Sequence, residues 1–250
     1  MDPELFWRYL LDFATLYPGA VLCFVPALEF LRTPRRTLPL AAAVLTALIV
    51  ADAALCACFR WNSNHFMLAE LAIVFFLYRR LFAPKFSRRR AAFSFLTGVW
   101  LVEVSVLLAL IFNARAELGN TLPVCLPSTA LLALALAAAL GAVYCLTAAR
   151  WIARLLRAFP AERIWRVAWL PLALCTVCYV FFLPRDPSIV LCERVQSVAV
   201  LAVLVSLLLV FLLLYALYCG GHEYLARLKL TQENHLLAME SQRYQELRAY

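Results

Sequence analysis

The feature that most limits the fold of this chain is a run of 23 residues without a charged side chain, Ser197 to Cys219. An α-helix rises about 1.5 Å per residue, so such a run can cross a hydrocarbon core of roughly 30 Å. Charged residues make up 15% of the chain and hydrophobic residues 65%, whereas soluble domains carry about 25% charged residues. The sequence therefore predicts an integral membrane protein.

Six further apolar stretches precede this run, separated by charged or Pro- and Gly-containing segments. We expect an all-α fold with a bundle of seven transmembrane helices over residues 1–219. Pro18, Gly19 and Pro26 should kink the first helix. The predicted spans are Leu5–Leu31, Leu38–Phe59, Phe66–Phe82, Ala91–Phe112, Val124–Ala149, Val167–Leu183 and Gln196–Cys219.

Lys and Arg residues divide unequally between the two sides of the predicted bundle. One set of loops, together with the C-terminal tail, holds 18 of the 23 basic residues, and the other set holds five. The positive-inside rule assigns the richer side to the cytoplasm. We therefore expect the N-terminus outside and the tail inside. Because the net charge of +8 comes from these short loop clusters, no nucleic-acid partner is expected.

Acidic side chains lie inside the predicted spans, away from the basic loops. Asp52, Glu70 and Glu103 fall in the second, third and fourth spans. An ionised carboxylate near mid-bilayer costs about 2.5–3.5 kcal/mol, so such residues normally face the bundle interior. We expect the three to converge on a cavity that binds a ligand or senses a signal, with Arg8 or Arg60 as counter-ion. The simpler interpretation, interhelical hydrogen bonding without a ligand, stays open.

The nine cysteines do not form the framework of a small secreted domain, because most lie in apolar runs. Cys125 and Cys192 fall in the two longer outer loops and are candidates for a disulfide between the fifth and seventh spans. No metal-ligand spacing, phosphate-binding loop or catalytic motif occurs in the sequence. We therefore expect no metal, no cofactor and no catalytic residue in this chain.

The tail carries two apolar stripes on a predicted helix. One stripe steps by seven residues, through Leu230, Leu237 and Tyr244. The other steps by eleven residues and comprises Leu225, Leu228, Leu236, Met239, Leu247 and Tyr250. Because each stripe is narrow, we expect the helix to pair with a second copy as a parallel homodimeric coil. The two registers cannot both face one partner, so the helix either packs on two sides or switches between two packing states. A solvated, partly frayed helix is the simpler alternative.

Gly220 and Gly221 mark the predicted boundary between the membrane bundle and a cytoplasmic signalling helix at residues 220–250. Glycine weakens a helix interior by about 1 kcal/mol relative to alanine. The pair is therefore a candidate hinge, or a point where the helix axis changes direction.

A multi-span membrane half followed by TQENHLLAMESQRYQELRAY, Thr231–Tyr250, resembles the GHKL-class sensor histidine kinases of bacterial two-component systems. The layout is most similar to the peptide-pheromone receptors among them. In that family the bundle senses a signal, and the tail helix leads into a dimerisation helix with a phospho-accepting histidine in a segment like R-H-D-x-x-H-H. The resemblance implies a sensor in the bacterial cytoplasmic membrane, with an extracellular peptide or small molecule as ligand.

The two histidines of the tail depart from this pattern. Neither His222 nor His235 is followed by the family's Asp or second His, and the Asn-rich and Gly-rich ATP-binding boxes do not occur. Kinase activity would therefore belong to a longer protein that contains this sequence. We expect a membrane input module of a two-component system in contact with lipid. The alternative is a small transporter or permease-like protein, or a membrane assembly partner whose tail docks a cytoplasmic subunit.

Overall fold

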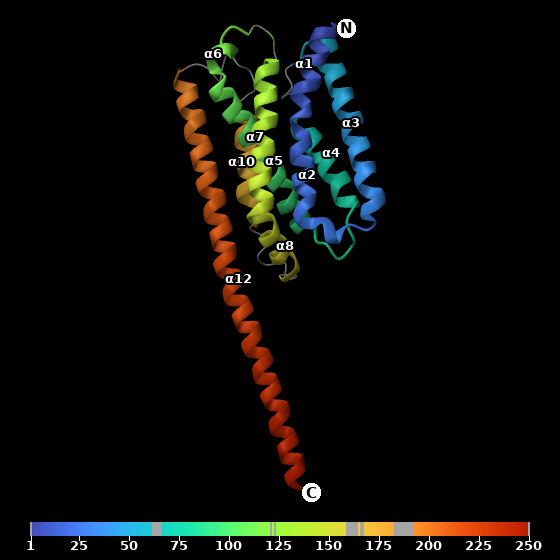
Figure 1. The fold of residues 1–250 in the computed structure, drawn as a ribbon, viewed down its shortest axis with the longest axis vertical. Coiled ribbons are helices and arrows are strands. Elements are labelled where there is room, and N and C mark those ends of the chain that lie inside the picture. Colours follow the sequence, from blue (N-terminus) through green and yellow to red (C-terminus); the bar gives the residue numbers. More distant parts are fainter. Residues whose placement is uncertain are drawn as a thin grey trace. The chain divides into compact units, whose positions relative to one another are not determined.

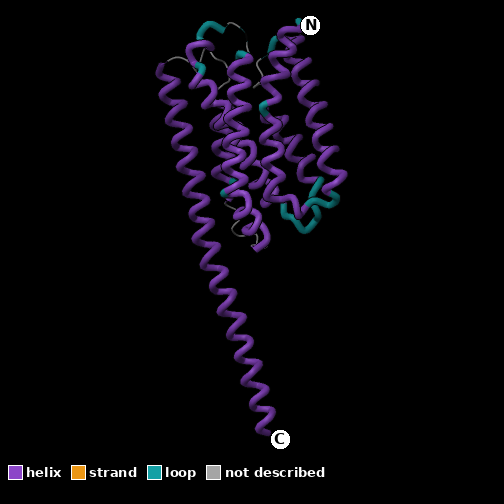
Figure 2. Tube along the Cα trace, viewed as in Figure 1, coloured by secondary structure: helices purple, strands orange, loops and turns teal. Residues whose placement is uncertain are grey.

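The fold is helical throughout the described residues. A computed structural model describes residues 2–61, 67–120, 122, 124–158, 165, 168–182 and 193–249. Within these ranges the only pairing of extended backbone is an isolated antiparallel bridge between Leu31 and Phe82, and Figure 2 shows helices joined by short loops. The predicted all-α fold is confirmed.

The described helices follow one another with short connections (Figure 1). They are α1 (Pro3–Ala14), α2 (Leu16–Phe24), the 3-10 helix η1 (Val25–Phe30), α3 (Pro34–Phe59), α4 (Met67–Arg80), α5 (Arg88–Phe112), α6 (Ala114–Glu117), α7 (Pro127–Leu146), α8 (Ala148–Ala158), α10 (Leu170–Phe182) and α12 (Glu193–Ala249). The chain divides into two compact units, Met1–Leu207 and Leu208–Tyr250, and α12 runs through the boundary between them.

Four helical segments are long and apolar enough to cross a membrane: Pro3–Phe30, Pro34–Phe59, Arg88–Phe112 and Pro127–Leu146. Large apolar side chains also lie on the surface of the first unit, with Phe76 71% exposed and Leu146 73% exposed. Such surfaces are unfavourable in water and suit a hydrocarbon environment. The membrane character predicted from the sequence therefore agrees with the structure, while the count of seven spans and the orientation stay predictions.

The first of these segments is interrupted twice. Helix α1 ends at a turn at Thr15, whose hydroxyl donates to the Asp12 carbonyl at 2.6 Å. Pro18 has no N–H to donate to the carbonyl four residues earlier, which explains a break at this point. Pro26 lies at the start of η1 and removes another helical donor. The kink predicted from the prolines is therefore present as two local changes of helix geometry.

The segment after α7 folds differently from the prediction. We expected the fifth span to continue to Ala149, but α7 ends at Leu146 and the separate helix α8 begins at Ala148. Helix α8 is amphipathic: Ala149, Ile152, Leu155 and Leu156 are buried, and its three arginines are exposed. The exposed arginines are Arg150, Arg154 and Arg157. This alternation repeats every three to four residues and indicates a helix.

Helix α5 is the central element of the first unit. It packs against α2, α4, α7 and α10, and most of its side chains are buried. Its start is fixed by Ser87, whose hydroxyl accepts a hydrogen bond from the Arg90 backbone N–H at 3.3 Å. Because α5 contacts helices on several sides, a movement of any of these helices changes the surroundings of side chains on α5.

Candidate functional site

A cavity of about 110 Å³ lies between α2, α3, α4 and α5. It has room for several water molecules, since one water needs about 10–15 Å³ by this measure. Part of its wall reaches the surface of the bundle, because Ile73 is 55% exposed. The lining residues are Leu16, Gly19, Ala20 and Cys23 of α2, Leu45, Leu48, Ile49 and Asp52 of α3, Glu70, Leu71, Ile73 and Val74 of α4, and Phe95, Val99, Val102 and Glu103 of α5.

The three acidic residues singled out in the sequence all line this cavity. Asp52 comes from α3, Glu70 from α4 and Glu103 from α5. Asp52 and Glu70 are half-buried, whereas Glu103 is only 3% exposed. The structure therefore brings together three carboxyl groups that are far apart in the sequence, in a site whose other walls are apolar.

Glu103 also connects the cavity to α10. Its Oε2 accepts a hydrogen bond from the Thr176 hydroxyl at 3.4 Å, and both residues are buried. Among the residues that the structure describes, no Lys, Arg or His lines the cavity. The two arginines proposed as counter-ions do not line it either, and Arg8 instead pairs with Glu4 at 2.6 Å. All three carboxyl groups line one cavity inside the bundle, so the cavity suits a proton or a cationic group.

Further polar groups lie beside the cavity. Cys56, one turn after Asp52 on α3, is buried in the apolar cluster that also contains Ile49 of the cavity wall. Tyr9 of α1 donates to the Trp61 carbonyl at 2.6 Å and belongs to the same apolar cluster as Cys56. The contact of Tyr9 fixes the end of α3 against α1. The part of α3 that carries Asp52 is therefore packed against α1.

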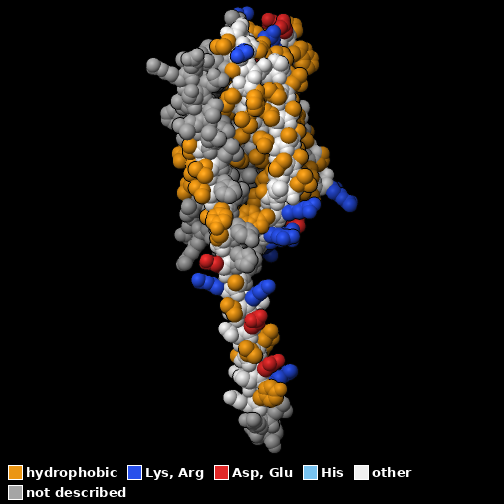
Figure 3. All heavy atoms as spheres, turned by 60° about the vertical axis from the view of Figure 1, so that its left-hand side comes forward, with side chains coloured by type: hydrophobic (Ala, Val, Ile, Leu, Met, Phe, Trp, Pro, Cys, Tyr) orange, Lys and Arg blue, Asp and Glu red, His pale blue; other side chains and the backbone are white. Residues whose placement is uncertain are grey.

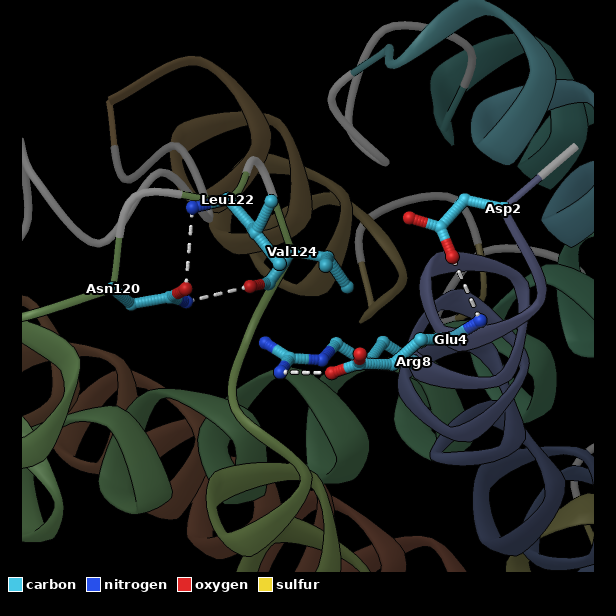
Figure 4. A network of polar contacts seen from close by, with 6 residues as sticks. All are labelled: Asp2, Glu4, Arg8, Asn120, Leu122 and Val124. Carbon is cyan, nitrogen blue, oxygen red and sulfur yellow. Dashed lines mark hydrogen bonds and ion pairs between the residues drawn. The ribbon is translucent and has the colours of Figure 1, made fainter.

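Sequence reasoning missed a buried carboxyl group at the connection between α5 and α7. Glu117 is 1% exposed and accepts hydrogen bonds from the Leu126 N–H at 2.8 Å, the Asn120 side chain at 3.0 Å and the Thr129 hydroxyl. Asn120 also donates to the Val124 carbonyl at 2.7 Å (Figure 4). These bonds order the connection, and the signal in the sequence was a Glu and an Asn three residues apart in the short segment between two apolar runs.

The loop ordered by Glu117 packs against the N-terminal helix. Val124 belongs to the apolar cluster that contains Leu5 and Tyr9 of α1. Figure 4 shows the loop together with the start of α1, where Arg8 points toward Glu4. The network therefore holds one end of the bundle together.

The remaining predicted sites stay untested. Cys125 is buried, but Cys192 lies outside the described residues, so the predicted disulfide stays a prediction. In the ranges that the structure describes, no group of three or more His, Cys, Asp or Glu residues is arranged to hold a metal ion.

The tail is helical where it is described. Gly220 and Gly221 lie inside the continuous helix α12, and their role as a hinge stays a prediction. Members of both apolar stripes are exposed: Leu228, Leu236 and Met239 of one, and Leu230, Leu237 and Tyr244 of the other. The side chains of Leu225, Leu247 and Tyr250 lie outside the described part.

Comparisons with protein-family models, with curated proteins and with solved structures found no match.

Proposed function

We propose that this chain is the membrane input module of a signalling protein, with the cavity as its sensing site and the end of α12 as its output. The observation that supports this proposal is the cavity, because Asp52, Glu70 and Glu103 from three helices line it together. Buried ionisable groups in a membrane bundle are unfavourable unless they serve a purpose, and they commonly mark functional sites. The GHKL-like layout of the sequence supports the same function.

The proposed arrangement has seven membrane spans, with the N-terminus outside and the tail in the cytoplasm. Four helices meet the length and hydropathy that a span needs. Helices α4 and α10, with 14 and 13 described residues, lie within the predicted spans Phe66–Phe82 and Val167–Leu183. Each of these spans has 17 residues, the lower end of the length that crosses a bilayer. The charge difference between the two sets of loops supports the orientation.

The proposed mechanism begins with a change of occupancy or protonation in the cavity. A cation or proton that neutralises the three carboxyl groups removes their mutual repulsion, so α3, α4 and α5 can pack more closely. Glu103 then changes its contact with Thr176 on α10. In the sequence α10 leads to α12, whose movement changes the packing of the tail. A ligand drives this step by binding one arrangement more tightly than the other.

In this proposal the tail acts as a homodimer. Both apolar stripes of α12 carry exposed side chains, and a narrow apolar stripe is buried effectively by a second identical helix. One packing state would use the seven-residue stripe and the other the eleven-residue stripe. An extracellular peptide or a small molecule is the expected type of signal.

Disulfide cross-linking tests the output end of the proposal. Single cysteines are placed at each position from Leu225 to Tyr250 of the full chain, in a background without the natural cysteines, and membranes are oxidised. A parallel homodimer predicts cross-linked dimers that recur every 3.5 to 3.7 residues. Uniformly weak cross-linking, or cross-linking without periodicity, would reject the dimer and favour a tail that docks another subunit.

A further inference from the structure

Three arginines from separate parts of the chain lie in one region at one end of the bundle. The segment after η1 pairs with the segment after α4, because the Arg32 N–H donates to the Leu81 carbonyl at 3.2 Å and the Ala83 N–H to the Phe30 carbonyl at 3.0 Å. This pairing holds Arg32 beside the end of α4, where Arg79 lies. The charges of both Arg32 and Arg88 act on the Arg79 guanidinium. We call Arg32, Arg79 and Arg88 the arginine cluster.

At least one buried N–H donor of the arginine cluster has no acceptor among the described residues. The Nε of Arg79 is buried and has no hydrogen-bond partner among the described residues. The Nε of Arg32 donates to the Phe82 carbonyl at 2.9 Å. None of the three arginines has an ion pair with an Asp or Glu in the described ranges; the nearby Glu29 instead pairs with Arg157 at 2.6 Å.

Such an arrangement is unfavourable unless an anion is bound. A buried donor without an acceptor costs about 1–3 kcal/mol, and more when the group is charged. Three guanidinium groups in one place add mutual repulsion. The start of α5, which follows Ser87, adds the partial positive charge of a helix N-terminus beside Arg88. The guanidinium groups and the start of α5 all favour a bound anion. A phosphate fits them well, because arginine binds phosphate through paired N–H donors.

The position of the arginine cluster indicates that the phosphate belongs to a membrane lipid. On α4 the exposed Phe76 and Leu77 are followed, after the buried Tyr78, by Arg79 and the exposed Arg80. The surface therefore changes from apolar to basic within one helical turn. Figure 3 shows blue Lys and Arg side chains at the lower end of the bundle, below an orange and white wall. This is the level at which phospholipid headgroups border the hydrocarbon.

We propose that the arginine cluster binds the headgroup phosphate of an anionic phospholipid. The lipid's acyl chains would lie along the exposed apolar side chains of α4, and its phosphate would accept hydrogen bonds from Arg79 and its two neighbours. The site is separate from the acid-lined cavity, so it does not depend on the proposed sensing function.

Lipid binding to the full chain in nanodiscs tests this proposal. Retention of phosphatidylglycerol, added to a phosphatidylcholine background, is measured by native mass spectrometry for the wild type and for Arg88→Gln and Arg79→Gln. Loss of a charged hydrogen bond predicts about tenfold weaker phosphatidylglycerol binding for each variant. Arg88 is exposed, so its variant keeps the fold, which thermal unfolding verifies.

The matched control is Arg150→Gln, on the exposed face of α8. This change removes one positive charge outside the cluster and should leave lipid retention unchanged. Equal losses for Arg150→Gln and Arg88→Gln would overturn the site, because binding would then depend on total charge alone. Inorganic phosphate is the second arm: if it displaces phosphatidylglycerol at millimolar concentration, the assignment to lipid is wrong and a soluble phosphate is the ligand.

Discussion

Gly19 and Gly98 face each other where α2 crosses α5, and neither position has room for a methyl group. A Cβ at Gly19 would lie 3.1 Å from the Gly98 carbonyl oxygen, and a Cβ at Gly98 would lie 2.9 Å from the Cys23 backbone nitrogen. Two backbones therefore meet directly, as small residues allow in membrane helices. Both Gly19 and Cys23 line the cavity, so this crossing sets the position of one cavity wall.

Gly98→Ala should destabilise the bundle by about 1–3 kcal/mol, because the added methyl group meets backbone atoms that cannot move independently. The measurement is thermal unfolding of the purified protein in nanodiscs. Gly220→Ala is the matched control, since a Cβ there meets nothing within 4 Å. It should have no destabilising effect and gain up to about 1 kcal/mol of helix propensity. Equal stability of the two variants would contradict the close crossing.

Glu117→Ala should destabilise the fold by about 1–3 kcal/mol, because the Leu126 N–H and the Thr129 hydroxyl lose a buried acceptor. Thermal unfolding in the same nanodiscs measures this effect. The control is Glu4→Ala, which removes a carboxylate that is 74% exposed and bound to Arg8. Such surface pairs contribute less than about 1 kcal/mol. A smaller effect for Glu117 than for Glu4 would show that the network does not order the loop.

Arg90→Met should destabilise the bundle by about 1.5–3 kcal/mol, the range for hydrogen bonds to charged groups. The buried guanidinium donates to the Leu156 carbonyl at 3.1 Å and to the Lys85 carbonyl at 3.0 Å. It thereby joins α8 to the start of α5. Arg157→Gln, which breaks an ion pair whose two side chains are 55% and 59% exposed, should change stability by less than about 1 kcal/mol. Chemical unfolding monitored by tryptophan fluorescence compares the two.

The sequence was sufficient for the class of fold, and it located acidic residues inside apolar runs. Apolar runs have to become helices in a membrane because lipid offers no hydrogen bonds to the backbone. A carboxyl group inside such a run has to face other helices, which is why Asp52, Glu70 and Glu103 could be identified before their geometry was known. Whether these three residues line one cavity depends on how α3, α4 and α5 are each rotated about their own axes. The loops and the α2–α5 crossing determine these rotations, and no local pattern in the sequence gives them.

Other features depended on contacts that no local pattern reveals. Arg90 looked like one of several basic loop residues, but its guanidinium is buried because α8 offers the Leu156 carbonyl. Glu117 lies in the connection between two predicted spans, and the return of the chain to Leu126 and Thr129 supplies two of the three hydrogen bonds that it accepts. The pairing of Leu31 with Phe82 joins positions 51 residues apart, which sequence periodicity does not address.

The most direct test of the proposed function asks whether the cavity controls the tail. The cysteine scan from Leu225 to Tyr250 is repeated in Glu70→Gln and Glu103→Gln backgrounds, which mimic neutralised carboxyl groups, and in the control Glu29→Gln at an exposed site away from the cavity. The account predicts that both cavity variants move the strongest cross-links from one stripe to the other, such as from Leu237 to Leu236, while the control does not. An identical cross-linking pattern in all four proteins would contradict coupling between cavity and tail.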